Sequence, residues 1–483
     1  MKSVCTCHST GATAGYRAVR PPDFYCAPWC CSPSAIRICH LWVPHTLPGW
    51  SRAARLADRT PASRNRYVDL LRAASMLVVT VGHWLAAAPY FDANGALIGA
   101  HILTAVPWTA WLTWIVQVMP IFFIVGGYAN GVSWRAARRD GRSYATWLES
   151  RLRRLVWPLI PLLVAWVAIV AIEYARGVRP ELIRYGSQVA FIPIWFLAVY
   201  IVIVLLVPAL EAAWTRLGLR SFWALTAAAI VVDILYFVVG VRWLGFVNYL
   251  FVWGAISLLG YAWLDNRFSS RRMLLLCAAL ALVVLLSLVL GGPYPVSMVG
   301  NPDEAVSNTT PPKVTLIALA VVQGGVLFAL QAAARRWLAG RSAWTATVLI
   351  NANIMTLFIW HLTATVLVVL GSYLAGGVGL RLEPGSTAWW WSRIPWVAAN
   401  AIAIVPLVLA FGRFERPRPV EGSPASPWRY VMGALAIGGG LALLAGQGVG
   451  GYGPLGLNMW GLALAFTGIC LISRRGESSE EPA

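Results

Sequence analysis

The chain has 483 residues, of which 59% are hydrophobic and only 12% are charged. A soluble globular protein carries about 25% charged residues, so this composition excludes a chain built from ordinary soluble domains. The net charge of +19 comes almost entirely from arginine and invites a nucleic-acid-binding interpretation. The arginines stand in short segments between apolar blocks, however, which excludes nucleic acid as a partner and favours a role in membrane orientation.

Apolar runs of about 18 or more residues recur along the chain, and each can cross the ~30 Å hydrocarbon core of a bilayer as a helix. Solid apolar blocks do not fit a membrane barrel, whose strands alternate between apolar and polar residues. We therefore predict an all-α fold, a polytopic transmembrane helix bundle of about 10–12 membrane helices surrounded by membrane lipids. The expected spans are 67–88, 108–134, 155–174, 189–210, 221–240, 244–264, 273–292, 313–334, 348–374, 394–412, 430–447 and 457–473.

The arginines alternate between the loops that join these spans. If the N-terminus is cytoplasmic, the inside loops fall at 135–154, 216–220, 267–272, 335–341, 413–429 and 474–475. These loops hold about three times as many arginines and lysines as the outside loops, which is the bias of the positive-inside rule. The pattern predicts a multi-pass protein of the plasma (inner) membrane with cytoplasmic N- and C-termini.

The first span contains ionisable residues, which cost about 2.5–3.5 kcal/mol each at the centre of a membrane helix. Arg72 and His83 are eleven residues apart, so they share one helix face and lie about 16 Å apart along the axis. Asp69 stands three residues before Arg72 and can pair with it. In a simpler interpretation, Arg72 extends to the interface and His83 is a packed core residue.

The sequence "RYVDLLRAASMLVVTVGHW" resembles the first membrane helix of the acyltransferase 3 family. The family signature there is an Arg, ten residues and a His, preceded by Asp-Gly-Leu-Arg. Arg72 and His83 match that spacing and Asp69 matches the Asp, whereas Leu70 stands where the family usually has Gly.

Four further blocks resemble the family in the expected order. "MPIFFIVGGYANG" is similar to a Phe-Phe-Phe-Leu-Ser-Gly-Tyr block, with Gly126 in place of the Ser. "LESRLRRLVWPLIPLL" resembles the Arg-rich start of the third helix, "IPIWFLAVYIVIVLLVP" a Trp-Phe-Leu helix, and "IMTLFIWHLTA" a late Tyr-Leu-Ile-His block. The residues in register in these three blocks are Arg151, Arg154 and Pro158, then Trp195, then His361.

This resemblance implies an acyltransferase that moves an acyl group from cytoplasmic acyl-CoA to a hydroxyl of an envelope carbohydrate, lipid or small molecule. It implies His83 as general base and Arg72 as a catalytic cation, because a neutral imidazole with a reference pKa of ~6.5 suits deprotonation of a hydroxyl. Substrate binding would then involve Asp69, Arg151, Arg154, Trp195 and His361. Acyl-CoA is expected as a co-substrate, with no other cofactor and no metal.

Several of these residues also have simpler roles that the sequence leaves open. Arg151 and Arg154 can act only as topology signals, and Trp195 as a packing or interface aromatic residue. His361 is either a partner of the catalytic histidine or a core histidine. For the whole chain, the alternatives are a multi-pass transporter or flippase for an envelope precursor, or an inactive partner in an envelope complex.

The resemblance also predicts how the chain is divided. Residues 64–412 form the acyltransferase 3-like membrane domain, and 413–473 add two further membrane helices. Residues 1–63 are rich in Cys, Pro and Arg and are expected to be a disordered cytoplasmic extension; 474–483 are expected to be a disordered acidic tail. The cysteine spacing in the extension does not suit zinc, although a metal site there stays an alternative.

Overall fold

The computed structural model describes residues 49–61, 63–268, 270–301, 304–415, 425–451 and 453–473, all within one unit of the chain, residues 46–483. This part of the chain is almost entirely helical. Its one sheet is the antiparallel hairpin of β1 (Ala87–Phe91) and β2 (Leu97–His101). The predicted all-α fold is confirmed. The cysteine-rich segment up to residue 48 and the tail from residue 474 lie outside the described residues.

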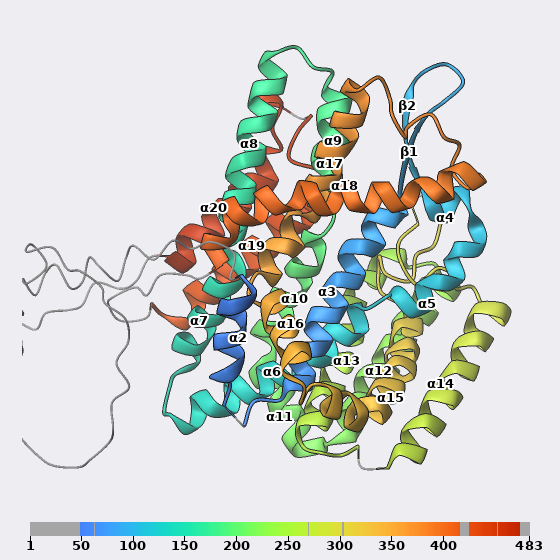
Figure 1. Cartoon of the computed structure of the whole chain (residues 1–483). Helices are drawn as coiled ribbons and strands as arrows, with labels where there is room; N and C mark the ends of the chain where they lie inside the picture. Colours follow the sequence, from blue (N-terminus) through green and yellow to red (C-terminus); the bar gives the residue numbers. More distant parts are fainter. Residues whose placement is uncertain are drawn as a thin grey trace, which may run out of the picture. The chain divides into compact units, whose positions relative to one another are not determined.

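The helices follow one another along the chain as drawn in Figure 1. The first half contains α2 (Trp50–Asp58), α3 (Arg66–Ala86), α4 (Ile102–Ala105), η1 (Pro107–Leu112), α5 (Thr113–Val116), α6 (Met119–Arg139), α7 (Tyr144–Val156), α8 (Leu159–Ala175), α9 (Pro180–Phe191), α10 (Ile194–Leu205), α11 (Val207–Leu217) and α12 (Leu219–Ile234). The second half contains η2 (Leu235–Val239), η3 (Arg242–Val247), α13 (Asn248–Leu264), α14 (Arg271–Gly291), α15 (Val314–Trp337), α16 (Arg341–Asn351), α17 (Ile354–Leu374), α18 (Thr387–Phe411), η4 (Gly412–Glu415), α19 (Pro427–Gln447), η5 (Pro454–Gly456) and α20 (Met459–Ser473).

Within the described ranges, ten helical runs are long and apolar enough to cross a membrane. An eleventh is the pair of α9 and α10, which meet at a bend of 46° beside Pro193. In place of the twelfth expected span stands α20, an apolar helix of 15 residues. The chain is therefore a multi-pass membrane protein.

Helix α2 lies in the segment that we expected to be disordered. Its buried residues Ala53 and Ala57 are four apart, so they share one face. The helix packs against α16. Beside it, Arg341 donates two hydrogen bonds to Asp58, at 3.2 and 2.7 Å. Contact with α16, rather than burial in lipid, holds this short helix. For this reason the sequence has no long apolar run here.

The loops of the bundle gather on two opposite faces. On one face, Thr104 donates to Asn301 at 3.0 Å, and the backbone N–H of Phe91 donates to the carbonyl of Leu380 at 2.7 Å. On the other face, Arg66 donates to the carbonyl of Leu338 at 3.1 Å, close to the arginine-rich segments. The loops that we expected on the outside thus contact one another, as do loops that we expected on the inside.

The arginine bias predicts which of these two faces meets the cytoplasm. A cysteine placed at Asn94, an exposed residue of the hairpin turn, should react with an impermeant maleimide in intact cells. A cysteine at the exposed Arg139 should react only after permeabilisation, in the same background with native cysteines replaced. Labelling of both positions from outside would contradict the orientation.

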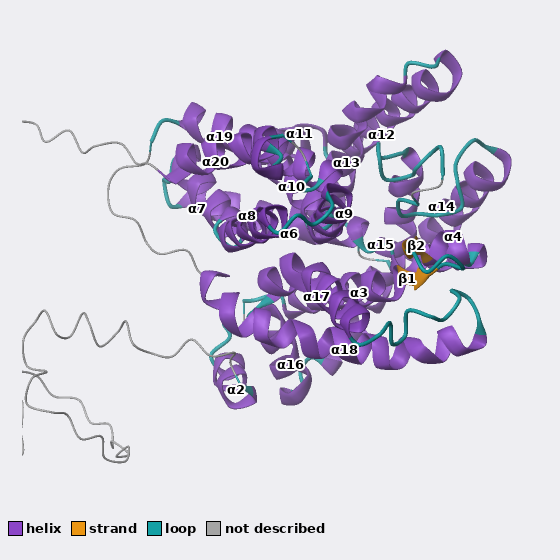
Figure 2. Ribbon diagram, turned by 90° about the horizontal axis from the view of Figure 1, so that it is seen from above, coloured by secondary structure: helices purple, strands orange, loops and turns teal. Residues whose placement is uncertain are grey.

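Helix α3 takes a central position for the candidate site. It packs against α6, α15, α16, α17 and α18. Seen from above, α3 and α17 lie side by side, and α18 crosses beside both of them (Figure 2). The first span and the late histidine block, almost 300 residues apart in sequence, are therefore neighbours in space.

Candidate active site

Two histidines from distant parts of the chain form a direct pair. His83 lies near the end of α3 and His361 lies within α17. The Nδ1 atom of His83 is 2.7 Å from Nε2 of His361, and the two rings are parallel within 1°. His361 is fully buried, whereas His83 keeps part of its surface accessible. His83 is therefore the more exposed member of the pair.

The hydrogen bonds assign the tautomer of both rings in their neutral state. Nδ1 of His361 is 2.6 Å from the carbonyl oxygen of Phe358, and a carbonyl can only accept, so Nδ1 carries the proton. Nε2 of His361 is then an acceptor, and Nδ1 of His83 must donate to it. This leaves Nε2 of His83 unprotonated. Its lone pair is available to a hydroxyl group.

Tryptophans and small polar side chains hold the helices that carry the pair. Trp84 donates from its indole to the carbonyl of His361 at 3.0 Å, which links α3 to α17. From α18, Trp396 donates to the carbonyl of Trp84 at 2.7 Å. Thr365 of α17 donates to Asn400 of α18 at 2.8 Å. These interhelical bonds fix the position of His83 relative to His361.

A group of positive charges lies toward the other end of α3. Arg72 is eleven residues before His83, or about 16 Å along the helix axis. It interacts electrostatically with Arg154 of α7 and with Tyr200 of α10, and Arg151 interacts with the same two residues. Although Arg72 lies on a membrane helix, 37% of its side chain is accessible. The three arginines thus form one group of neighbouring positive charges.

The model of the family described as acyltransferase domain matches residues 65–413, which include both histidines and all three arginines. The chain belongs to the acyltransferase 3 family. It is therefore a membrane acyltransferase. Searches of curated proteins and of solved structures find no match. The resemblance inferred from the five sequence blocks is confirmed at the level of the family.

In this acyltransferase, Asp69 binds Arg64 as well as the Arg72 that we expected. Asp69 accepts two hydrogen bonds from Arg64, at 2.6 and 2.9 Å, which raises the pKa of the Arg64 guanidinium. The distance from Asp69 to Arg72 is 4.0 Å. Helical spacing alone favours the Arg72 pair, but Arg64 precedes α3 and folds back over its first turn. The contact of Asp69 with Arg72 is thus the longer and weaker of the two.

The arginines of the third block belong to a helix rather than to a loop. Ser143 accepts a hydrogen bond from the backbone N–H of Thr146 and so caps α7, which begins eleven residues before the expected span at 155. Within α7, Arg151 donates to the carbonyl of Ala129 on α6 at 3.0 Å. This bond turns Arg151 toward the inside of the bundle, which a topology signal alone does not require.

Trp195 does not join the histidine pair through its described contacts. It stands at the start of α10 and packs on Phe196 and Trp253, each with a ring separation of 6.4 Å. Its neighbour Phe196 contacts Phe358, whose carbonyl binds His361, with ring centroids 5.7 Å apart. A role for Trp195 in substrate binding stays a prediction.

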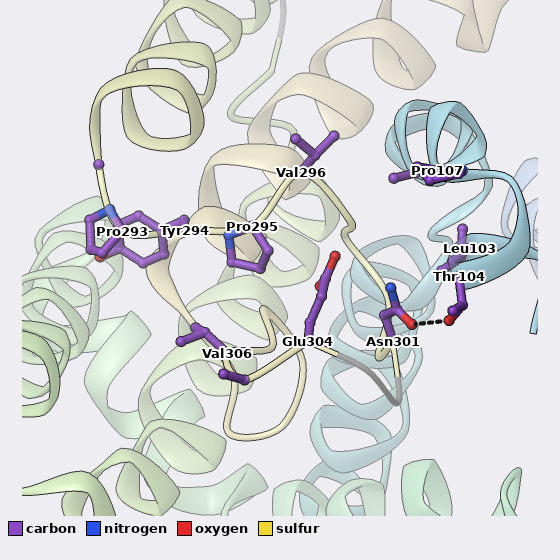
Figure 3. Close-up of a pocket in the computed structure, with 13 residues that line it drawn as sticks. Leu103, Thr104, Pro107, Pro293, Tyr294, Pro295, Val296, Asn301, Glu304 and Val306 are labelled. Atoms are coloured by element: carbon purple, nitrogen blue, oxygen red, sulfur yellow. Dashed lines mark hydrogen bonds between the residues drawn. The ribbon is translucent and has the colours of Figure 1, made fainter.

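Two cavities lie apart from these residues. A cavity of about 650 Å³ opens between the loops on the hairpin face, where Thr104 and Asn301 join its two sides (Figure 3). Glu304 lines it, and burial raises the pKa of its carboxyl. A second cavity of about 470 Å³ lies between α14 and α15 and is lined by Arg271 and Arg335. Neither contains the histidine pair or the arginine group.

Metal ligands do not gather anywhere in the part of the chain that the structure describes. No group of three or more His, Cys, Asp or Glu residues there has an arrangement that could hold a metal ion. The candidate site combines two imidazoles and three guanidiniums with the hydroxyl of Tyr200, and the sequence analysis did not identify Tyr200.

Proposed function

We propose that this membrane acyltransferase moves an acyl group from acyl-CoA to a hydroxyl of an envelope carbohydrate, lipid or small molecule. The observation that carries the proposal is the His83–His361 pair, whose hydrogen bonds leave Nε2 of His83 unprotonated. A general base must be within reach of its substrate and in the correct protonation state, and the unprotonated Nε2 of His83 supports this role.

In the proposed step, Nε2 of His83 takes the proton of the acceptor hydroxyl as its oxygen attacks the thioester carbonyl carbon. A C–O bond forms, the C–S bond breaks, and the imidazolium returns the proton to the departing thiolate of CoA. His361 accepts the Nδ1–H of His83 throughout, so it keeps the ring oriented and stabilises its transient positive charge. Acyl ester and free CoA are the two products.

The arginine group is the proposed binding site of the acyl donor. Guanidinium groups bind phosphate oxygens well because their N–H donors match them in pairs. The separation of about 16 Å between Arg72 and His83 is of the same order as an extended pantetheine arm. Phosphates of acyl-CoA bound at Arg72, Arg151 and Arg154 would therefore place the thioester near His83.

The membrane location belongs to the same proposal. Acyl-CoA is a cytoplasmic metabolite, and the arginine group lies on the half of α3 that begins at Arg66, near the arginine-rich loops. We place the protein in the plasma (inner) membrane with both termini in the cytoplasm, as the arginine bias predicts. The donor would then reach its site from the cytoplasm.

The transporter alternative depends on embedded ionisable groups that could relay ions. Asp233 accepts hydrogen bonds from Asn248, Tyr294 and the backbone N–H of Val314, at 2.9 to 3.1 Å. Glu173 pairs with Arg176 at 3.2 Å. Both carboxylates thus have local structural partners, which favours the enzyme over the transporter.

Turnover by the purified protein tests the proposal. With labelled acetyl-CoA and an extract of envelope glycans and lipids, we expect release of free CoA together with products heavier by one acetyl unit, measured by mass spectrometry. Flux of an envelope precursor in vesicles without acyl transfer would support the transporter instead.

His361 should behave as a positioning residue. Replacing it with leucine leaves Nδ1–H of His83 without an acceptor, so we expect the kcat to fall about tenfold to a hundredfold. His361→Gln keeps an acceptor oxygen and should recover much of this loss, with KM for acetyl-CoA unchanged in both variants. Equal losses in the two variants would contradict the hydrogen-bond role.

A further inference from the structure

Tyr200 lies on α10 and faces the arginine group described above. Its ring is fixed by aromatic packing against Phe196 and Phe123, with centroid distances of 5.6 and 6.0 Å. Its side chain remains partly accessible. Both Arg72 and Arg151 interact electrostatically with it. Arg151 also binds the carbonyl of Ala129, the residue before the Asn130 that contacts Tyr200, so the tyrosine hydroxyl lies near this cation.

The hydrogen bonding of Tyr200 determines where its proton can go. The amide nitrogen of Asn130 donates to the Tyr200 hydroxyl oxygen at 3.3 Å. Because that oxygen is already an acceptor, the O–H proton of Tyr200 is directed to some other acceptor. The neighbouring guanidiniums of Arg72 and Arg151 only donate, so they cannot receive it.

Gly126 of α6 provides the space that the tyrosine needs. A β-carbon at Gly126 would come within 2.8 Å of Tyr200 Cε2 and 3.2 Å of its hydroxyl oxygen. The same helix carries Asn130 one turn later. Together, Gly126 and Asn130 set both the position of the Tyr200 ring and the direction of its hydroxyl.

Protein carboxylates neutralise this group only in part. Across the described ranges, neither Arg151 nor Arg154 forms an ion pair, and Asp69 is held principally by Arg64. Cations that are only partly neutralised by the protein favour an anionic ligand. An oxygen of that ligand can then accept the hydrogen bond from the O–H group of Tyr200.

We propose that Tyr200 binds the acyl donor. Its hydroxyl group donates a hydrogen bond to a pyrophosphate oxygen of acyl-CoA, and Arg72 and Arg151 hold the same pyrophosphate. This inference rests on the proposed function. The pyrophosphate is the group concerned because it follows the pantetheine arm directly, at the distance from the thioester that separates Arg72 from His83. The hydroxyl binds the donor equally in the ground state and in the transition state.

Tyr200→Phe removes only the hydroxyl and keeps the packed ring. We expect KM for acetyl-CoA to rise about tenfold or more, because a hydrogen bond to a charged oxygen is lost. The kcat should stay within about twofold, since uniform binding contributes to KM alone. Tyr144→Phe is the matched control: its hydroxyl donates to the backbone carbonyl of Leu205 at 3.0 Å, and KM should not change.

Three acyl donors that differ in their phosphate groups show which part of the acyl donor loses its contact in Tyr200→Phe. The rise in KM should be the same for acetyl-CoA and acetyl-3′-dephospho-CoA, which share the pyrophosphate, and absent for S-acetylpantetheine, which lacks it. A rise confined to acetyl-CoA would assign Tyr200 to the 3′-phosphate and overturn the proposal, as would a loss shared by all three donors or no loss. Direct titration of CoA into both proteins gives the same comparison if acyl transfer itself is not observed.

Discussion

Replacing His83 with alanine should slow acyl transfer from acetyl-CoA by about 10²–10⁴, the usual range for loss of a general acid or base. The physical reason is that Nε2 of His83 is the unprotonated nitrogen that the pair leaves without a hydrogen bond, whereas His361 is buried and its Nδ1 is bound to Phe358. The measurement is the rate of CoA release at saturating acetyl-CoA and acceptor.

The stability of the His83→Ala protein should change little, because removing a polar group from a membrane helix does not impair its insertion. Expression level and the melting temperature in detergent check this expectation. A normal rate in a normally inserted protein would show that His83 is a packing residue. A rate lost together with folding would leave the base unassigned, which is why a second variant is needed.

Arg72→Lys should lose most of the activity even though the charge is kept. A guanidinium contacts two phosphate oxygens at once, whereas an ammonium acts as a single compact charge. We expect KM for acetyl-CoA to rise by about tenfold or more, since the lost contact is a charge-assisted hydrogen bond. The measurement is the dependence of initial rate on acetyl-CoA concentration.

Arg64→Lys is the matched control for this variant. Arg64 also makes a two-point contact near the start of α3, but its partner is the Asp69 carboxylate of the protein itself. This substitution should affect stability more than KM. If lysine serves as well as arginine at position 72, a simple cation at the membrane interface is sufficient, and the donor site lies elsewhere.

The sequence predicts the fold well because its signals are long and redundant. Each apolar run reports a membrane helix independently, and the alternating arginines group the loops by face. The breaks within the helices give a weaker signal in the sequence. The bend between α9 and α10 beside Pro193 and the start of α7 at Ser143 depend on single residues, so hydropathy averaged over a window misses them.

The candidate site was predicted in part. Helical periodicity places Arg72 and His83 on one face, but it cannot show that α17 brings His361 against that face, since this is a contact between distant segments. Periodicity also favoured the Asp69–Arg72 pair over Arg64, which reaches Asp69 from outside the helix. Tyr200 carried no sequence signal of its own. Only packing against α6 and α7 reveals its hydroxyl beside the arginines.

The most direct test of the central claim is the turnover of purified His83→Gln with labelled acetyl-CoA. Glutamine can still donate to Nε2 of His361, so the contact between α3 and α17 is kept, but it cannot accept a proton at neutral pH. We predict a loss of at least about 10² in kcat relative to the wild type, with the melting temperature unchanged. Turnover close to the wild-type rate would contradict the assignment of His83 as the general base.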